Sequence, residues 1–150
     1  RVLFRSGHSH LAHLIVKEKW EICDVEKEIQ HDIHCNFKSG CDVATGSLGM
    51  GCSIALGLAM SDRKKNVWLL TSDGEMEEGV TWEVLKIKAE LKIDNLKWFI
   101  NANGYSALKN IDYEILKRRV HAFCPDVNVV KTDFFDLPFL NGIDAHYITI

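Results

Sequence analysis

The fold is decided by residues 66–74, which read Asn66-Val-Trp-Leu-Leu-Thr-Ser-Asp-Gly74. The run from Asn66 to Thr71 is almost continuously apolar, which is typical of a strand in a parallel sheet that helices cover on both faces. It ends at a carboxylate and a glycine, Asp73 and Gly74. Because ligands of α/β proteins bind beyond the carboxyl ends of the strands, this stretch predicts both a fold class and the place of a site.

The segments that follow repeat the pattern of helix and strand. Residues 75–91 carry apolar side chains on two helical stripes, which predicts a helix packed on two sides. Residues 96–100 predict a second buried strand, which ends at Asn-Ala-Asn-Gly, residues 101–104. A helix over 113–123 and a strand over 127–130 come next. We therefore expect an α/β fold with a doubly wound, mostly parallel sheet and helices on both faces.

The ends of the two predicted strands, over 66–71 and 96–100, are expected to contribute residues to one binding site. Right-handed crossovers place Asp73 and Asn103, 30 residues apart, at the same carboxyl edge of the sheet. Their oxygen atoms suit Mg²⁺, and Gly74 allows a phosphate to approach the backbone at the start of a helix. The alternative is that Asp73 caps the helix and that Asn103-Gly104 makes a turn. Spacing alone leaves both interpretations open.

Composition narrows the class of protein. The 150 residues, 47% hydrophobic and 26% charged, fit one globular domain over residues 1–150 and exclude disordered, collagen-like and coiled-coil chains. A net charge of −3 argues against a nucleic-acid partner. The apolar run over 54–60 is far shorter than the roughly 20 residues that span a bilayer, so no membrane segment is expected. Five irregularly spaced cysteines without a signal peptide favour reduced thiols and a cytoplasmic location.

Four segments resemble the diphosphate-binding domain of transketolase-like thiamine diphosphate enzymes. Residues 72–79, Ser-Asp-Gly-Glu-Met-Glu-Glu-Gly, together with Asn103-Gly104, resemble the family's Gly-Asp-Gly signature and its later Asn, with Ser at the first glycine. Residues 45–51, Thr-Gly-Ser-Leu-Gly-Met-Gly, resemble its TGSLGQG loop, with Met in place of the usual Gln. Gly7-His8 resembles its GH segment, and residues 144–147 resemble its late pair of an aromatic residue and His.

The resemblance implies a thiamine-diphosphate-binding fold that holds thiamine diphosphate and Mg²⁺ or Ca²⁺. It implies that Asp73, Asn103 and the backbone carbonyl of Tyr105 bind the metal. The backbone of Gly74 would donate hydrogen bonds to the diphosphate, assisted by His8 and His146. Gly46 and Leu48 would contact the aminopyrimidine and thiazolium rings. The cofactor-binding positions implied in this way are His8, Gly46, Ser47, Leu48, Asp73, Gly74, Glu75, Asn103, Tyr105 and His146.

The resemblance also implies a reaction, the transfer of a two-carbon ketol unit between sugar or sugar phosphate substrates. Glu78 resembles an acidic residue that lies near the boundary between subunits in the family. His34 or His31 would orient the hydroxyl groups of the substrate. The residues with an implied catalytic role are His8, His34, Glu78 and His146. The acid that activates the aminopyrimidine lies in a separate pyrimidine-binding domain of the family. A partner subunit with that domain, in a homo- or hetero-oligomer, is therefore expected.

The chain departs from the family's pattern in length. Only 43 residues separate Asn103 from His146, as though a late helix and strand were absent. We also expect the domain to lack the N-terminal segment that usually precedes the family's GH segment. We therefore expect a shortened domain. Other thiamine diphosphate reactions, such as 2-oxo acid decarboxylation or acyloin formation, and a degenerate domain kept for assembly without catalysis, remain alternatives.

Three other kinds of site are less well supported. The glycines at 46, 49 and 51 reverse the Gly-x-Gly-x-x-Gly spacing of dinucleotide-binding loops. His31, His34, Cys35 and Cys41 have side chains suited to zinc, but their spacing matches no usual knuckle. The histidines at 8, 10 and 13 could suggest a metal site, but three histidines so close together are more typical of polar positions at the start of a helix.

Overall fold

The computed structural model describes residues 2–5, 19, 43, 46–106 and 109–132. These residues contain one four-stranded sheet in which the order of the strands in space is their order in the chain. All three pairings are parallel. The strands are β1 (Val2–Arg5), β2 (Val67–Ser72), β3 (Leu96–Ala102) and β4 (Asn128–Lys131). The expected α/β class with a parallel sheet is confirmed.

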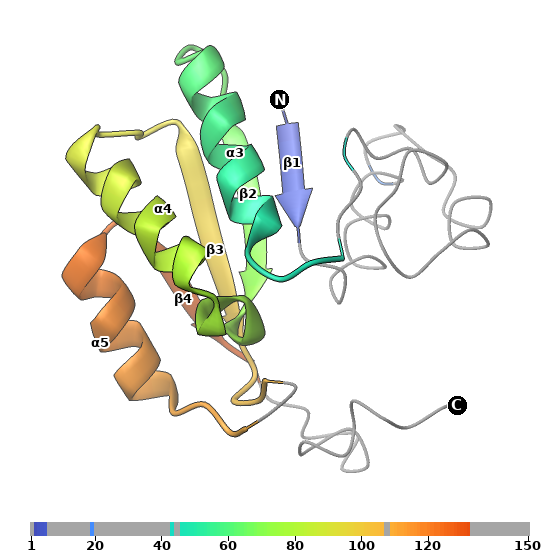
Figure 1. Cartoon of the computed structure of the whole chain (residues 1–150), viewed down its shortest axis with the longest axis vertical. Coiled ribbons are helices and arrows are strands. Elements are labelled where there is room, and N and C mark those ends of the chain that lie inside the picture. The colour runs from blue at the N-terminus through green and yellow to red at the C-terminus, as the bar shows by residue number, and fades with distance from the viewer. Residues whose placement is uncertain (1, 6–18, 20–42, 44–45, 107–108, 133–150) are drawn as a thin grey trace.

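Helices connect the strands along one face of the sheet. They are α3 (Met50–Ser61), the short 3-10 helix η3 (Asp73–Glu77), α4 (Gly79–Glu90) and α5 (Tyr113–Phe123). Figure 1 shows α3, α4 and α5 side by side over the strands. The prediction of a helix over 113–123 is confirmed to the residue. Whether helices also cover the opposite face, as expected, falls outside the described residues.

The helix predicted over 75–91 is in fact two helices. Glu78 has extended backbone angles, φ −89° and ψ 131°, which end η3 and begin α4. The expected burial of α4 on two sides is wrong for Val80 and Leu91, which are 37% and 50% exposed. Its inner stripe, with Val84 and Leu85, is buried against the sheet and the neighbouring helices.

The core lies between this helical layer and the sheet. Side chains alternate along β2 and β3, so that Val67, Leu69, Trp98 and Ile100 are at most 1% exposed. Intervening residues are half-buried or exposed. The Trp98 indole N–H donates to Thr71 Oγ1 at 2.9 Å, which satisfies the one polar group of the largest buried side chain. This packing fixes the ends of β2 and β3 relative to each other.

Two polar contacts hold the helical layer in place. The Asn95 side-chain amide donates to the carbonyls of Ala59, Asp62 and Lys65, which joins the end of α3 to the start of β3. Lys88 of α4 is 2% exposed and pairs with Asp126 at 2.5 Å. None of the helices in the described part of the chain is long and apolar enough to cross a membrane.

Candidate functional site

Asp73 lies where the sequence predicts it, at the carboxyl end of β2. It is the first residue of η3, and its side chain is 1% exposed. Its Oδ1 accepts the N–H of Gly74 at 3.1 Å, and its Oδ2 accepts the N–H of Gly104 at 2.8 Å. The second hydrogen bond joins the loop after β2 to the loop after β3. The strand register, which pairs Ser72 with Asn101, brings these loops together.

Asn103 and Gly104 form the turn that follows β3. Asn103 Oδ1 accepts the N–H of Tyr105 at 3.0 Å. Gly104 has φ +88°, a left-handed conformation that favours glycine, and its carbonyl accepts the N–H of Ile111 at 2.7 Å. The Asn103-Gly104 turn of the alternative interpretation is therefore present, but the expected helix cap at Asp73 is wrong, because the N-cap of η3 is Ser72 and no side chain makes a capping hydrogen bond there. The same turn keeps Asn103 and Tyr105 at the edge of the sheet beside Asp73.

The electrostatics of Asp73 fit a cation. Burial raises the pKa of its carboxyl group, while hydrogen bonds from backbone N–H groups act in the opposite direction. Among the described residues, no basic side chain forms an ion pair with it. Backbone N–H groups of Asp73 itself, Gly74, Gly104 and Tyr105 interact favourably with the carboxylate, and none of them carries a full charge. A carboxylate, a side-chain amide oxygen and a backbone carbonyl are kinds of ligand that Mg²⁺ and Ca²⁺ prefer, so Asp73, Asn103 and the Tyr105 carbonyl are candidate ligands.

Gly74 has open space beside its Cα. A Cβ at this position would lie 3.7 Å from Ser72 Oγ and 3.9 Å from Ser106 Cα, which are ordinary contact distances. The chain's own packing therefore does not require glycine here. The Gly74 N–H, expected to bind a diphosphate, donates to Asp73 in this structure, so a ligand oxygen would compete with the carboxylate for it.

The glycine-rich loop 46–51 leads into α3 next to this edge. Gly46 and Ser47 are exposed, and Leu48 is 39% exposed, so their surfaces are free to meet a ligand. Gly49 has φ +80°, and a Cβ there would lie 2.5 Å from Val80 Cγ1. In this loop the resemblance drew attention to Gly46, as a contact with the cofactor rings. The structure adds Gly49, which the reasoning from sequence missed because its contact lies on α4.

Glu75 links this loop to the segment after Asp73. It is 6% exposed, and its Oε2 accepts the N–H of Gly49. Its backbone carbonyl accepts the hydroxyl of Thr81 at 2.7 Å. Burial is the main cause that raises the pKa of its carboxyl group, and the nearby Glu78 adds to it. The half-buried Glu78 lies beside Gly49, at the start of α4.

Several expected site residues lie outside the described residues. They include the two histidines assigned to the diphosphate, His8 and His146, and both candidates for contact with substrate hydroxyls, His31 and His34. The residues of the alternative zinc site, which add Cys35 and Cys41 to these two histidines, also lie outside the described residues. Among the residues that are described, no group of three or more His, Cys, Asp or Glu side chains is arranged to hold a metal ion. The candidate ligands Asp73, Asn103 and the Tyr105 carbonyl include an amide and a backbone oxygen, so they are not a group of this kind.

The known proteins reported below as similar to this chain all have transketolase in their names. No protein-family model matches the chain. It is 34% identical over 95 residues to a transketolase family protein of Sinorhizobium fredii, and 29% identical over 140 residues to transketolase-like protein 2 of Mus musculus. These matches cover 58% and 82% of this chain. It is also 43% identical over 61 residues, 38% of its length, to an apulose-4-phosphate transketolase subunit of Actinobacillus succinogenes.

The chain matches only part of each relative. It spans 34% of the Sinorhizobium protein and 22% of each of the other two. A solved structure, transketolase from Campylobacter jejuni, shares the fold with a TM-score of 0.63 at 24% identity. That match covers 81% of this chain and 23% of the Campylobacter chain.

Proposed function

Because this chain is transketolase-like in sequence and in fold, we propose that it binds thiamine diphosphate through Mg²⁺ or Ca²⁺. In complex with a subunit that carries a pyrimidine-binding domain, it transfers a two-carbon ketol unit between sugar substrates. The observation that carries the proposal is the Asp73 carboxylate, buried without a basic partner among the described residues and held at the ends of two adjacent strands.

The surroundings of Asp73 support the metal-binding role that we propose for it. Hydrogen bonds from Gly74 and Gly104 fix the direction of the carboxylate before any ligand arrives. Burial disfavours the charged carboxylate, and a divalent cation would offset that cost. Asn103 and the Tyr105 carbonyl complete the protein's share of the ligands, and phosphate oxygens suit the remaining positions.

The loop at 46–51 orients the organic part of the cofactor. Glu75 and Gly49 hold this loop against the segment that begins with Asp73. Gly46, Ser47 and Leu48 can then present exposed surface to the rings. When bound, thiamine diphosphate supplies a carbon nucleophile and an electron sink for cleavage of the bond beside a carbonyl. The contribution of this chain is to bind and orient the cofactor rather than to change its intrinsic chemistry.

A partner subunit is part of the proposal. The similarity to a protein that is named as one subunit of a transketolase supports an enzyme divided between two chains. Glu78, half-buried at the start of α4, is our candidate for the acid near the subunit boundary. His8, His34 and His146 remain proposed catalytic residues.

Calorimetric titration tests the cofactor site. Thiamine diphosphate is titrated into the full chain with Mg²⁺ and again with EDTA, and the same is done for Asp73→Ala. The matched control is Asp94→Ala, which removes an exposed aspartate at the opposite end of β3. We expect Mg²⁺-dependent binding that Asp73→Ala weakens at least about tenfold and the control leaves unchanged. Equal affinity of Asp73→Ala and the original chain would refute the site.

A donor assay tests the reaction separately. Ketose phosphates and 2-oxo acids are compared as donors, with the chain supplied alone and with a pyrimidine-domain subunit. Ketol transfer only in the presence of that subunit is the expected result. Turnover of 2-oxo acids alone would favour the decarboxylase alternative, and cofactor binding without any turnover would favour a non-catalytic assembly domain.

A further inference from the structure

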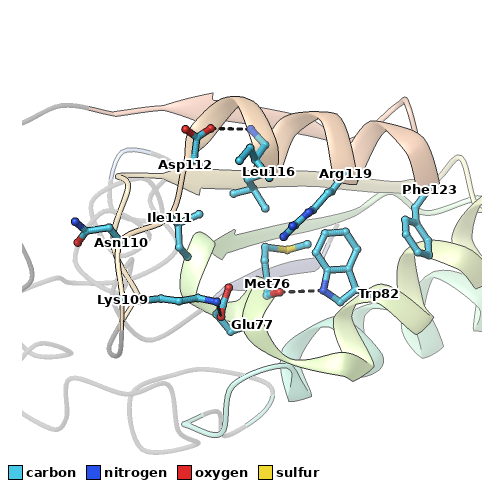
Figure 2. Close-up of a pocket in the computed structure, with 11 residues that line it drawn as sticks. Met76, Glu77, Trp82, Lys109, Asn110, Ile111, Asp112, Leu116, Arg119 and Phe123 are labelled. Carbon is cyan, nitrogen blue, oxygen red and sulfur yellow. Dashed lines mark hydrogen bonds and ion pairs between the residues drawn. The ribbon is translucent and has the colours of Figure 1, made fainter.

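A pocket of about 710 Å³ lies between η3, the start of α4, residues 109–112 and α5 (Figure 2). It shares no lining residue with the proposed cofactor site. Its volume is in the range of small-molecule sites, about 300–1,000 Å³. The lining residues are Met76, Glu77, Trp82, Lys109, Asn110, Ile111, Asp112, Ile115, Leu116, Arg119 and Phe123.

One part of the pocket is apolar and aromatic. Met76 and Leu116 are 3% and 4% exposed and contribute buried surface to it. The rings of Trp82 and Phe123 have centroids 5.4 Å apart and are tilted by 53°. The Trp82 indole N–H already donates to the Met76 carbonyl at 2.9 Å, so the ring offers an apolar surface without an unmet donor.

The charged side chains in the lining differ in whether they have a partner. Lys109 Nζ lies 2.6 Å from Glu77 Oε2, so these two charges offset each other. Asp112 Oδ1 accepts the N–H of Ile115 at 2.8 Å and caps α5. Arg119 forms no ion pair or hydrogen bond with any other residue in the described part of the chain. Figure 2 shows its side chain pointing from α5 towards Met76 and Trp82.

We propose that this pocket binds a small organic acid with an aromatic or branched aliphatic body and a single carboxylate. The body packs against Trp82 and Phe123, and the carboxylate accepts paired hydrogen bonds from the Arg119 guanidinium. A monoanion fits better than a phosphate dianion. Among the described lining residues Arg119 is the one cation without a partner, and the carboxylate of Asp112, which forms no ion pair with them, would repel a second negative charge.

Phenylacetate and its neutral counterpart phenylacetamide test the proposal in the unaltered full chain. Each is titrated into ¹⁵N-labelled protein, and the indole N–H signal of Trp82, assigned with Trp82→Phe, is followed by NMR. Saturable binding of phenylacetate with a Kd of about 1 mM is expected for a ligand of this size. The amide should bind about tenfold more weakly because it has no charge for Arg119.

Two neighbouring arginines give a matched pair of variants. Arg119→Gln should weaken phenylacetate binding about tenfold. Arg118→Gln should leave it unchanged, because Arg118 is exposed on α5 but does not line the pocket. If Arg119→Gln fails to fold, the comparison of acid with amide still decides. Equal affinity for the acid and the amide, or no Trp82 response in folded protein, would overturn the proposal. Loss of phenylacetate binding on adding a partner subunit would show a protein interface instead and would also overturn it.

Discussion

Replacement of Gly49 by Ala should destabilise the chain through two separate effects. The first is conformational, because φ +80° costs a residue with a Cβ about 1–2 kcal/mol relative to glycine. The second is steric, because the new Cβ would lie 2.5 Å from Val80 Cγ1 and 3.0 Å from Glu78 Cβ. Forced contacts of this kind cost about 1–3 kcal/mol. The expected loss is therefore about 2–5 kcal/mol, a large part of the 5–15 kcal/mol that typically stabilises a domain.

Urea unfolding of the full chain, followed by far-UV circular dichroism, measures this loss. The control is Gly57→Ala, because a Cβ on Gly57 in α3 would meet nothing within 4 Å. That control should gain about 0.5–1 kcal/mol, since alanine is the better helix former. Val80→Ala in the Gly49→Ala background should restore only the steric loss that Val80 Cγ1 causes, because the contact with Glu78 Cβ and the conformational cost remain. A Gly49→Ala chain as stable as the original, or one that Val80→Ala does not improve, would refute the reasoning.

Four further predictions concern the site and the helical layer. Gly74→Ala should leave the free energy of unfolding within about 1 kcal/mol but weaken thiamine diphosphate binding in calorimetry, because a Cβ fits the chain but occupies the ligand's approach; a large loss of stability would contradict this. Glu75→Leu should lower the free energy of unfolding in urea by about 1–3 kcal/mol, because it leaves the Gly49 N–H unpaired. Glu75→Gln keeps an acceptor and should lower it less. Equal losses for the two variants would exclude the hydrogen bond as the cause. Because the pKa values of Asp73 and Glu75 are raised in the folded state, these groups bind more protons there than in the unfolded chain, so their contribution to stability should fall as the pH rises above about 4. Thermal unfolding in EDTA and in Mg²⁺ across this range should show that the cation reduces the fall, and a curve that Mg²⁺ leaves unchanged would argue against a cation at Asp73. Asp126→Ala should destabilise the chain by about 3–5 kcal/mol, because it leaves the buried Lys88 charge without a partner. Lys88→Met should cost less, because the Asp126 side chain that it leaves unpaired is 54% exposed to water. A larger loss for Lys88→Met in urea unfolding would contradict this assignment of burial.

The sequence predicted the elements well where the pattern is local. The apolar runs of β2 and β3 and the amphipathic stripe of α5 each contain their own signal. The break at Glu78 was missed because apolar residues continue at helical spacing on both sides of it. The exposure of Val80 was missed for a related reason, since periodicity shows which residues share a stripe but not whether another element covers that stripe.

The site was predictable to the extent that topology dictates it. Parallel pairing of β2 with β3 is enough to bring the ends carrying Asp73 and Asn103 to one edge, and the structure confirms that these segments are joined. The hydrogen bond from Gly49 to Glu75 was not predictable. It connects residues 26 apart in the chain, and acidic residues at the start of a helix already have a local explanation in the helix dipole.

These contacts would connect cofactor binding at the proposed site to the stability of the folded chain. Asp73 and Glu75 are carboxylates in the same short helix, and burial is the largest cause that raises the pKa of each. Each is held by backbone N–H groups, and among the described residues neither has a basic side chain as partner. Burying such groups costs stability, which the packing of Trp98 and the surrounding core must offset. A cation bound at Asp73 would remove part of that cost. The edge of the sheet should therefore gain most from ligand binding at neutral pH, where the unbound carboxylates destabilise the folded state most.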